Sequence, residues 1–325
     1  MRAIFKAIMI FSFMSLLLCG CKKDDDNQTE VSMISEFESD KLIVQTTASS
    51  TATGFGAVFE NMITDTMERV NFIREYISLV RYFDDQSGYF YVEDFLGWNI
   101  AHPLRDDIVG SYRYNVQDVK GNYYHHTMCD LAKTAGEGFV SYYFTNPASN
   151  EVEEKMTCIA AIPGIDYFVG TGFYIRSTEP GITVDESNLL ITKNYTKTAA
   201  LGFSGVFEEL YTDSLDRLNV IRILIDPIRF FEDETGYFFV NHINGLCLAH
   251  AFNDELVGQN QYNLEDSHGN NFIQEMCSVA TTTGSGYVTY YWTNPITGAD
   301  EKKISYIERI PGTDCYIGSG VYLKE

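Results

Sequence analysis

Apolar and polar residues follow two periods along this chain, first the period of a helix and then that of a strand. From about Glu186 to Ile225, apolar residues recur at steps of three and four, which predicts one long amphipathic helix. Residues 226–236 contain Pro, Gly and several acidic residues, and they predict the end of that helix. The same apolar rows occupy residues 58–77, so the helix has an earlier counterpart.

Five short segments rich in aromatic and β-branched residues follow the long helix and predict strands. They read "GYFFV", "GLCLAHA", "GYVTYYWT", "KKISYIERI" and "DCYIGSGVYL". Between the second and the third, "NNFIQEMCSVATTT" predicts a short helix that ends at Gly284. Strands joined by short turns pair antiparallel, so we expect an α+β unit with the long helix on one face of a five-stranded sheet. The short helix covers part of the other face, and the space beneath it suits a small ligand.

The complete pattern occurs twice, at a constant offset of 148 residues. His102 recurs as His250 and Lys155 recurs as Lys303, with matching Gly, Met-Cys, Thr-Asn-Pro and Pro-Gly positions between and around them. Solenoid repeats are only about 20–50 residues long, so each copy here is a whole domain. A chain of 325 residues is long enough for two domains, each with its own core.

The chain is strongly acidic, with a formal net charge of −22. Such a surface repels nucleic acid, so we expect no DNA or RNA partner. An odd number of cysteines follows residue 21, and most of them are expected to be small buried apolar residues, with a disulfide left open. These cysteines are Cys129, Cys158, Cys247, Cys277 and Cys315.

Residues 1–20 predict a bacterial lipoprotein signal peptide. Arg2 and Lys6 precede an apolar run that is too short for a stable spanning helix. The sequence "LCGC" that follows resembles a lipobox, in which Cys21 would be acylated with fatty acids such as palmitate. An ordinary signal peptide is the alternative. Because several acyl chains hold a protein stably on a membrane, we expect a lipid anchor in the cell envelope, at the outer membrane.

Residues 21–35 begin with "CKKDDDNQTE", which predicts an extended acidic tether. This stretch resembles the sorting signal of surface-exposed lipoproteins in Bacteroidota-type bacteria, and a plain spacer is the alternative. Removal of residues 1–20 takes away two positive charges and leaves a formal net charge of −24. No later apolar segment approaches the length of a membrane span.

Each repeat resembles the Cache domain, the extracytoplasmic PAS-like sensor module of bacterial receptors, in its second single-Cache type. The resemblance rests on an ordered set of short motifs, which in the second copy read "GYFFV", "AH", "GYV", "KKISY", "IPG" and "IGSGVY". It implies two domains, residues 36–176 and 184–325, each with a cavity that binds small molecules, often short carboxylates. Most Cache modules feed an output domain, whereas Glu325 directly follows the last predicted strand. We therefore expect a signal to leave through an envelope partner such as a receptor or transporter.

Lys303 and His250 are the leading candidates for ligand contact. A carboxylate needs a cation or good donors in a partly desolvated pocket, and Lys and His supply them. The preceding strand adds Tyr290 and Trp292 on one face, and the first strand adds Tyr237. Either pocket can be the functional one, because the repeats have diverged unequally. The counterparts in the first repeat are Tyr89, His102, Tyr142, Phe144 and Lys155.

Each candidate also has a structural interpretation. A Lys at a strand start is usually a solvated edge residue, and a His after a strand is often a core or capping residue. Tyr237 and Tyr89 can equally pack under the long helix. The histidines at 102, 125 and 126 do not form a metal motif, because positions 273 and 274 of the second repeat are Ile and Gln.

The chain has no nucleophile elbow, phosphate loop or dinucleotide fingerprint, so we expect no enzyme, no metal and no cofactor. The function expected from the sequence is an envelope lipoprotein that binds a small extracellular metabolite, such as a short organic acid. The alternative is a non-enzymatic structural or protein-interaction module of the envelope, whose pockets are filled by side chains.

Overall fold

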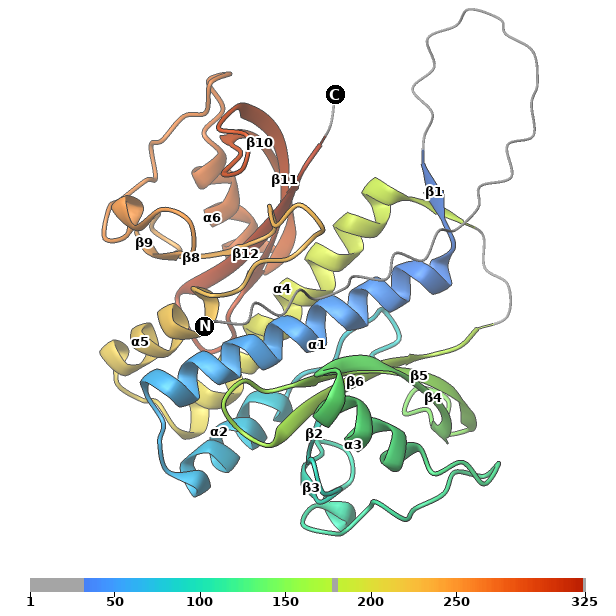
Figure 1. Ribbon diagram of the computed structural model, residues 1–325. Helices are drawn as coiled ribbons and strands as arrows, with labels where there is room; N and C mark the ends of the chain where they lie inside the picture. Colours follow the sequence, from blue (N-terminus) through green and yellow to red (C-terminus); the bar gives the residue numbers. More distant parts are fainter. Residues whose placement is uncertain (1–31, 177–180, 324–325) are drawn as a thin grey trace, which may run out of the picture. The chain divides into compact units, whose positions relative to one another are not determined.

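The computed structural model describes residues 32–176 and 181–323, which build the same α+β unit twice (Figure 1). The predicted signal peptide, the acylation site Cys21 and most of the predicted tether lie outside these residues. Two residues of that tether, Met33 and Ile34, form the short strand β1 (Met33–Ile34), which pairs with β7 (Ile182–Thr183).

The two units have the same order of elements. The first contains α1 (Glu36–Asn61), α2 (Thr66–Ser78), β2 (Phe90–Asp94), β3 (Asn99–Ala101), the 3-10 turn η1 (Asp106–Ile108), α3 (Tyr124–Thr134), β4 (Glu137–Thr145), β5 (Val152–Ala161) and β6 (Tyr167–Tyr174). The second contains α4 (Val184–Glu209), α5 (Ser214–Ile225), β8 (Phe238–His242), β9 (Cys247–His250), η2 (Asp254–Leu256), α6 (Phe272–Thr282), β10 (Ser285–Thr293), β11 (Asp300–Arg309) and β12 (Cys315–Tyr322).

Each unit has a five-stranded antiparallel sheet, in the orders β3-β2-β6-β5-β4 and β9-β8-β12-β11-β10. The predicted α+β class is confirmed. In the second sheet, Lys303 pairs with Tyr290 of β10 on one side and with Tyr322 of β12 on the other. Directly paired residues point to the same face of a sheet, so this register brings the three side chains together.

The predicted long helix is two helices in each unit, and the prediction of one continuous helix is wrong. α4 ends at Glu209 and α5 begins at Ser214. The Asp213 side chain accepts hydrogen bonds from the backbone N–H groups of Leu215 and Asp216, so it caps the new helix. Asp65 caps α2 in the same way. Apolar residues continue at the same spacing across the break, because each of the two helices buries its apolar side.

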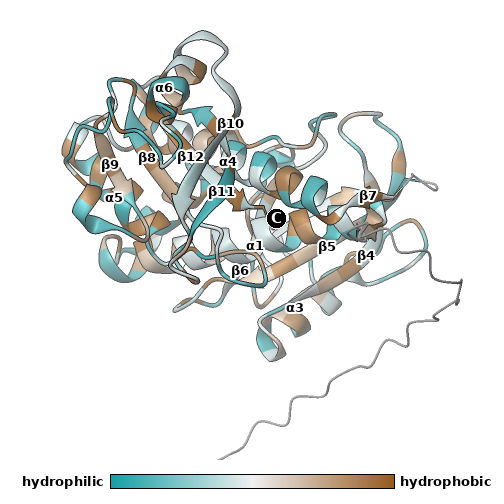
Figure 2. Ribbon diagram, turned by 90° about the horizontal axis from the view of Figure 1, so that it is seen from above, coloured by the Kyte–Doolittle hydropathy of each residue, from teal (hydrophilic) through white to brown (hydrophobic). Residues whose placement is uncertain are grey.

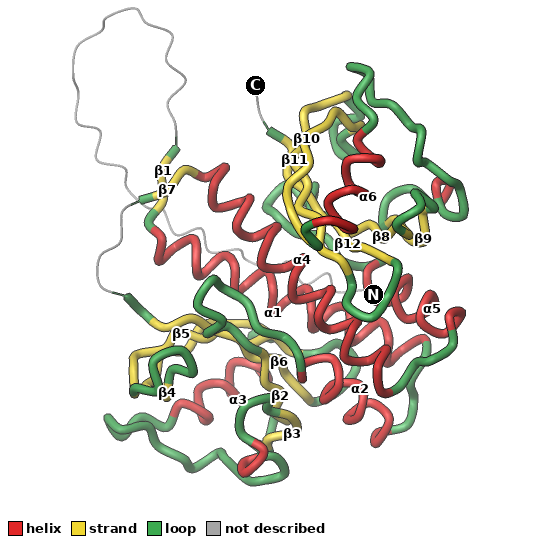
Figure 3. Tube along the Cα trace, turned by 180° about the vertical axis from the view of Figure 1, so that it is seen from behind, coloured by secondary structure: helices red, strands yellow, loops and turns green. Residues whose placement is uncertain are grey.

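The two units meet through equivalent surfaces. Ile34 pairs with Ile182, and the hydroxyl oxygens of Ser39 and Ser187 lie 2.7 Å apart. Each contact joins residues at the same position of the two repeats, as on a two-fold axis. Figures 1 and 3 show α1 and α4 side by side, with one sheet on either side of the helix pair.

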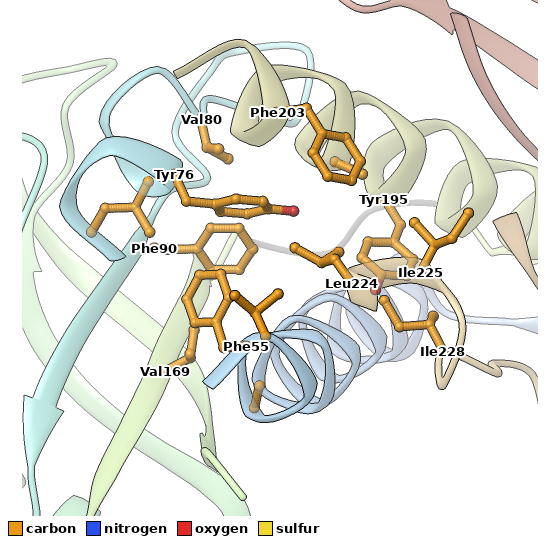
Figure 4. Packing of buried hydrophobic residues seen from close by; sticks show 14 of the residues in the cluster. Phe55, Tyr76, Val80, Phe90, Val169, Tyr195, Phe203, Leu224, Ile225 and Ile228 are labelled. Carbon is orange, nitrogen blue, oxygen red and sulfur yellow. The ribbon is translucent and has the colours of Figure 1, made fainter. Parts of the chain in front are cut away.

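One core runs through both units along these helices. Phe55 of α1 and Tyr76 of α2 meet edge to face with ring centroids 5.0 Å apart, and Tyr76 also contacts Phe203 of α4. Figure 4 shows these side chains packed together with Leu224 of α5. Since α2 packs on α4 and α5 packs on α1, each unit covers the other. A separate core for each domain was predicted, and along the helices the core is shared.

A second, separate layer belongs to each unit alone. α3 packs on β4 and β5, and α6 packs on β10 and β11, on the face opposite the long helices. Both short helices are amphipathic, and Figure 2 shows brown and teal residues alternating along each. Met128 and Met276, at matched positions, are fully buried beneath them. The predicted position of the short helix is confirmed, and this layer forms the candidate site.

Within residues 32–176 and 181–323, no helix combines the length and the apolar character that a membrane span requires. The five cysteines of this part of the chain are unpaired, and four of them are buried. Their interpretation as small apolar core residues is confirmed.

Candidate functional site

Each unit has a small, partly open cavity between its sheet and its short helix. The cavity measures about 20 Å³ in either unit, which is roughly the room that one water molecule needs. The first pocket is lined by Tyr89, Tyr91, Glu93, His102, Ile108, Arg113, Tyr124, His125, Tyr142 and Phe144. The second pocket is lined by Tyr237, Phe239, Asn241, His250, Leu256, Gln261, Phe272, Ile273, Met276, Tyr290 and Trp292.

Lys303 is a buried cation beside the second pocket. Its exposed fraction is 0%, and its Nζ atom lies 3.9 Å from the centre of the Tyr237 ring. It donates a long hydrogen bond of 3.4 Å to the hydroxyl of Tyr322. Among the described residues no salt bridge involves Lys303. Burial therefore lowers the pKa of Lys303 well below its usual value.

Lys155 takes the same place beside the first pocket. It is also 0% exposed, with its Nζ atom 3.9 Å from the centre of the Tyr89 ring and 5.1 Å from that of Tyr174. Its ammonium has no hydrogen-bond partner within the described part of the chain. Burial lowers the pKa of Lys155 to about 7.

Both lysines lie on central strands. β5 has β4 and β6 as neighbours, and β11 has β10 and β12, so neither Lys155 nor Lys303 is at the edge of its sheet. The interpretation of these residues as solvated edge lysines is wrong. Ammonium groups of this kind are rarely buried without a partner, because desolvation of a cation is costly.

His250 and His102 are held by their own backbone. Nδ1 of His250 accepts a hydrogen bond from the N–H group of Phe252, and Nδ1 of His102 accepts one from Leu104. Burial, followed by the charge of the nearby lysine, lowers the pKa of each ring to about 3. Each ring is therefore neutral at pH 7 and carries its proton on Nε2. Both histidines therefore cap their own backbone through Nδ1, and Nε2 of each ring makes no hydrogen bond within the described part of the chain.

Stacked aromatic rings form the walls of both pockets. Tyr290 lies parallel to Phe272 of α6 with centroids 4.5 Å apart, and its hydroxyl lies 2.9 Å from that of Ser305. Tyr142 stacks on Tyr124 of α3 at 4.2 Å in the first unit. Trp292 and Phe144 occupy matched positions beside these stacks, since their rings lie about 6 Å from Tyr290 and Tyr142. The short helix is thus joined to the sheet by aromatic contacts.

The ten predicted ligand-binding residues form two matched groups of five around the two pockets. Tyr237 and Tyr89 contact the buried lysines on the pocket side, so their placement under the long helix is wrong. That these ten residues bind a ligand stays a prediction. The two groups are Tyr237, His250, Tyr290, Trp292 and Lys303, and Tyr89, His102, Tyr142, Phe144 and Lys155.

Several lining residues were missed from the sequence. Tyr91 and Glu93 follow Tyr89 at steps of two, and strand alternation puts all three on one face. This signal was present in the sequence and could have identified both residues. Arg113 comes from a loop, and periodicity does not reach it. His125 pairs with Glu93 at 2.9 Å, and no cluster of three potential metal ligands occurs among the described residues.

A long helix pair on one face of a five-stranded antiparallel sheet, with an aromatic pocket on the other, defines a PAS-like sensor fold. Family models match both halves of the chain, "Single Cache domain 2" over residues 58–179 and "Cache domain" over residues 206–325. The chain belongs to the Cache family, and it carries two Cache domains in tandem.

Similar proteins include the sensor histidine kinase MctS of Rhizobium johnstonii, which is 27% identical over 145 residues. That match covers 43% of this chain and 31% of the kinase, so the chain spans about a third of this curated relative. A solved methyl-accepting chemotaxis protein of Vibrio parahaemolyticus is 25% identical, covering 40% of this chain and 87% of that one, with a TM-score of 0.34. A solved structure described as "Structural basis for carboxylic acid recognition by a Cache chemosensory domain" is also 25% identical, with a TM-score of 0.34. That match covers 39% of this chain and 86% of the other.

Proposed function

We propose that this chain binds a small organic acid in its Cache pockets and has no catalytic activity. The observation that carries the proposal is the buried lysine of each unit, Lys303 and Lys155, which has no acidic partner among the described residues. A buried ammonium without a counter-charge destabilises the fold. A carboxylate in the pocket supplies that counter-charge through a charge-assisted hydrogen bond. His250 or His102 donates a second bond from Nε2.

Binding requires the pocket to widen, because about 20 Å³ does not hold an organic acid. His250 lies at the natural entrance, since it lines both the second pocket and a surface groove of about 620 Å³. Arg222 of α5 and Asp226, which directly follows that helix, form another part of that groove. We infer that the acid enters past His250 and displaces the Tyr237 ring from Lys303.

The cell envelope is the proposed site of action. The predicted signal peptide, acylation at Cys21 and the acidic residues after it support a lipid anchor, with the Cache domains facing outward. The signal then passes to an envelope partner, a role that fits the resemblance to a sensor kinase and a chemotaxis protein.

The small cavity volume favours one alternative, an interaction module with filled pockets. Thermal unfolding of the mature chain with a panel of short carboxylates separates the two functions. A ligand at 100 times its Kd adds about 2.7 kcal/mol of stability, which is a readily measured shift of the Tm. An unchanged Tm across the panel would support the interaction module.

Calorimetry on Lys303→Met and Lys155→Met then assigns the site. Met keeps the apolar stem and removes a bond worth about 1.5–3 kcal/mol, so affinity should fall roughly ten- to hundredfold in the variant that carries the functional pocket. His250→Gln keeps a donor and should lose less affinity than His250→Ala. Unchanged affinity in the double lysine variant would contradict the assignment of these residues.

A further inference from the structure

The two pockets differ in polarity although their backbones are equivalent. All ten lining residues of the first pocket have a counterpart in the second at the repeat offset, and Met276 is the one additional residue there, so the differences are substitutions within a shared frame. Five lining positions change from a more polar residue in the first pocket to a less polar one in the second. These pairs are Tyr91 and Phe239, Glu93 and Asn241, Arg113 and Gln261, Tyr124 and Phe272, and His125 and Ile273.

Arg113 and Gln261 are each held in position by a backbone hydrogen bond to a glycine. The backbone N–H groups of these residues donate to the carbonyls of Gly97 and Gly245, at 2.7 and 2.8 Å. Gly97 has a φ of +92°, and a Cβ on it would lie 2.8 Å from Tyr114, so only glycine fits this close approach. Both loops thus deliver residue 113 or 261 to its pocket in the same way.

The charged groups of the first pocket leave two cationic donor atoms without a partner. The Glu93 carboxylate has both oxygens occupied, one by His125 at 2.9 Å and one by the amide of Asn99 at 3.4 Å. The Nε atom of Arg113 is buried and has no hydrogen-bond partner among the described residues, and the same holds for Nζ of Lys155. The acidic side chain is therefore satisfied, while two cationic donors are not.

The second pocket has one cation and an apolar wall. Lys303 keeps its place, but Gln261 replaces the arginine with a neutral amide, whose Nε2 atom is likewise buried without a partner in the described chain. Phe272 and Ile273 replace Tyr124 and His125 with hydrocarbon. A ligand here meets one positive charge and a surface that favours an alkyl chain.

We propose that the first pocket binds a dicarboxylate, with one carboxylate at Lys155 and the other at Arg113, and that the second binds a monocarboxylate with an apolar chain. This division of ligands rests on the proposed function, since it assigns a subclass of acid to each pocket. The chain is then a sensor of two different acids.

Calorimetry on the mature chain with succinate and butyrate tests the division, because the two acids have equal chain length and differ by one carboxylate. In Arg113→Gln the first pocket gains the residue that the second has, so the fold tolerates it. Succinate affinity should fall about ten- to hundredfold, as expected for loss of one charge-assisted bond, and butyrate affinity should stay unchanged. In Lys303→Met, butyrate affinity should fall and succinate affinity should stay unchanged.

Arg105→Gln is the matched control. Arg105 is partly exposed, pairs with Asp107 on η1 and does not line the pocket, so its removal tests for a general effect of positive charge. Its succinate affinity should equal that of the wild type. If monocarboxylates bind and succinate does not, or if Arg113→Gln weakens both acids equally, the division is wrong while the proposed function stands. If neither class of acid binds, both proposals are wrong.

Discussion

The buried Lys155 makes the stability of this protein depend on pH. Lys155 has a pKa of about 7 in the folded chain against an ordinary value of 10.5. Between these values the unfolded chain holds a proton that the folded chain has released, so the free energy of unfolding rises with pH across this range. The slope from this residue reaches about 1.4 kcal/mol per pH unit.

The variant Lys155→Met should lose this dependence. Urea unfolding of the wild type should give a free energy that increases from about pH 7 to about pH 10, whereas the variant should show a shallower increase. A bound carboxylate favours the charged lysine, so ligand affinity should decrease over the same range. Equal slopes in the two proteins would contradict a depressed pKa for Lys155.

The pocket residues show what a sequence can predict at this scale. Strand alternation and the repeat found Lys303, Tyr290 and Tyr237, because the first two lie in regular strands and Tyr237 directly precedes one. Burial of the lysine was missed, since the edge or centre position of a strand depends on pairing with distant segments. Arg113 was missed for a related reason, because a loop held by Gly97 brings it into the pocket.

At the scale of the elements, each long helix meets the shorter helix of the other unit at a glycine. A Cβ on Gly202 of α4 would lie 2.3 Å from the ring of Tyr76, and one on the matched Gly54 of α1 would lie 3.0 Å from Leu224. The ring is rigid and enclosed by the shared core, whereas the contacts of Gly54, with the side chain and the carbonyl oxygen of Leu224 at 3.0–3.1 Å, are longer. Glycine is thus required in α4 to let α2 approach.

This difference predicts unequal effects of two matched substitutions. Gly202→Ala should lower the free energy of unfolding by about 1–3 kcal/mol, because the methyl group overpacks the core. Gly54→Ala is the control and should be nearly neutral, since alanine gains up to about 1 kcal/mol in a helix and offsets a mild contact. Urea unfolding measures both. A Gly202→Ala protein as stable as Gly54→Ala would show that the interface adapts freely.

The order and type of the elements could be predicted from the sequence, and the relation between the two units could not. Five strands and a short helix follow from local periodicity. The helix break at Asp213 was missed because apolar residues continue on the same side across it. The shared core was missed because the sequence predicts that Phe55 and Phe203 are buried but does not show which residues they pack against.

For the whole molecule, the place in the cell depends on a single proposed modification. In the mature chain, acylation of Cys21 would be what retains the protein on the membrane. Cys21→Ala should move the protein from the membrane fraction to the soluble fraction on centrifugation and immunoblotting, with the wild type as control. A variant that still pellets with membranes in high salt would contradict the lipid anchor. Protease treatment of intact cells would then test exposure at the surface.

The self-matching contacts at Ser39–Ser187 and Ile34–Ile182 have a consequence for how this protein can evolve. In a dimer of identical chains, one gene encodes both halves, so every mutation appears twice and both pockets must change together. Here two stretches of one gene encode the halves. Residues near the axis still constrain each other across it, whereas pockets far from it are free to drift apart. Selection can therefore act on one pocket without altering the other.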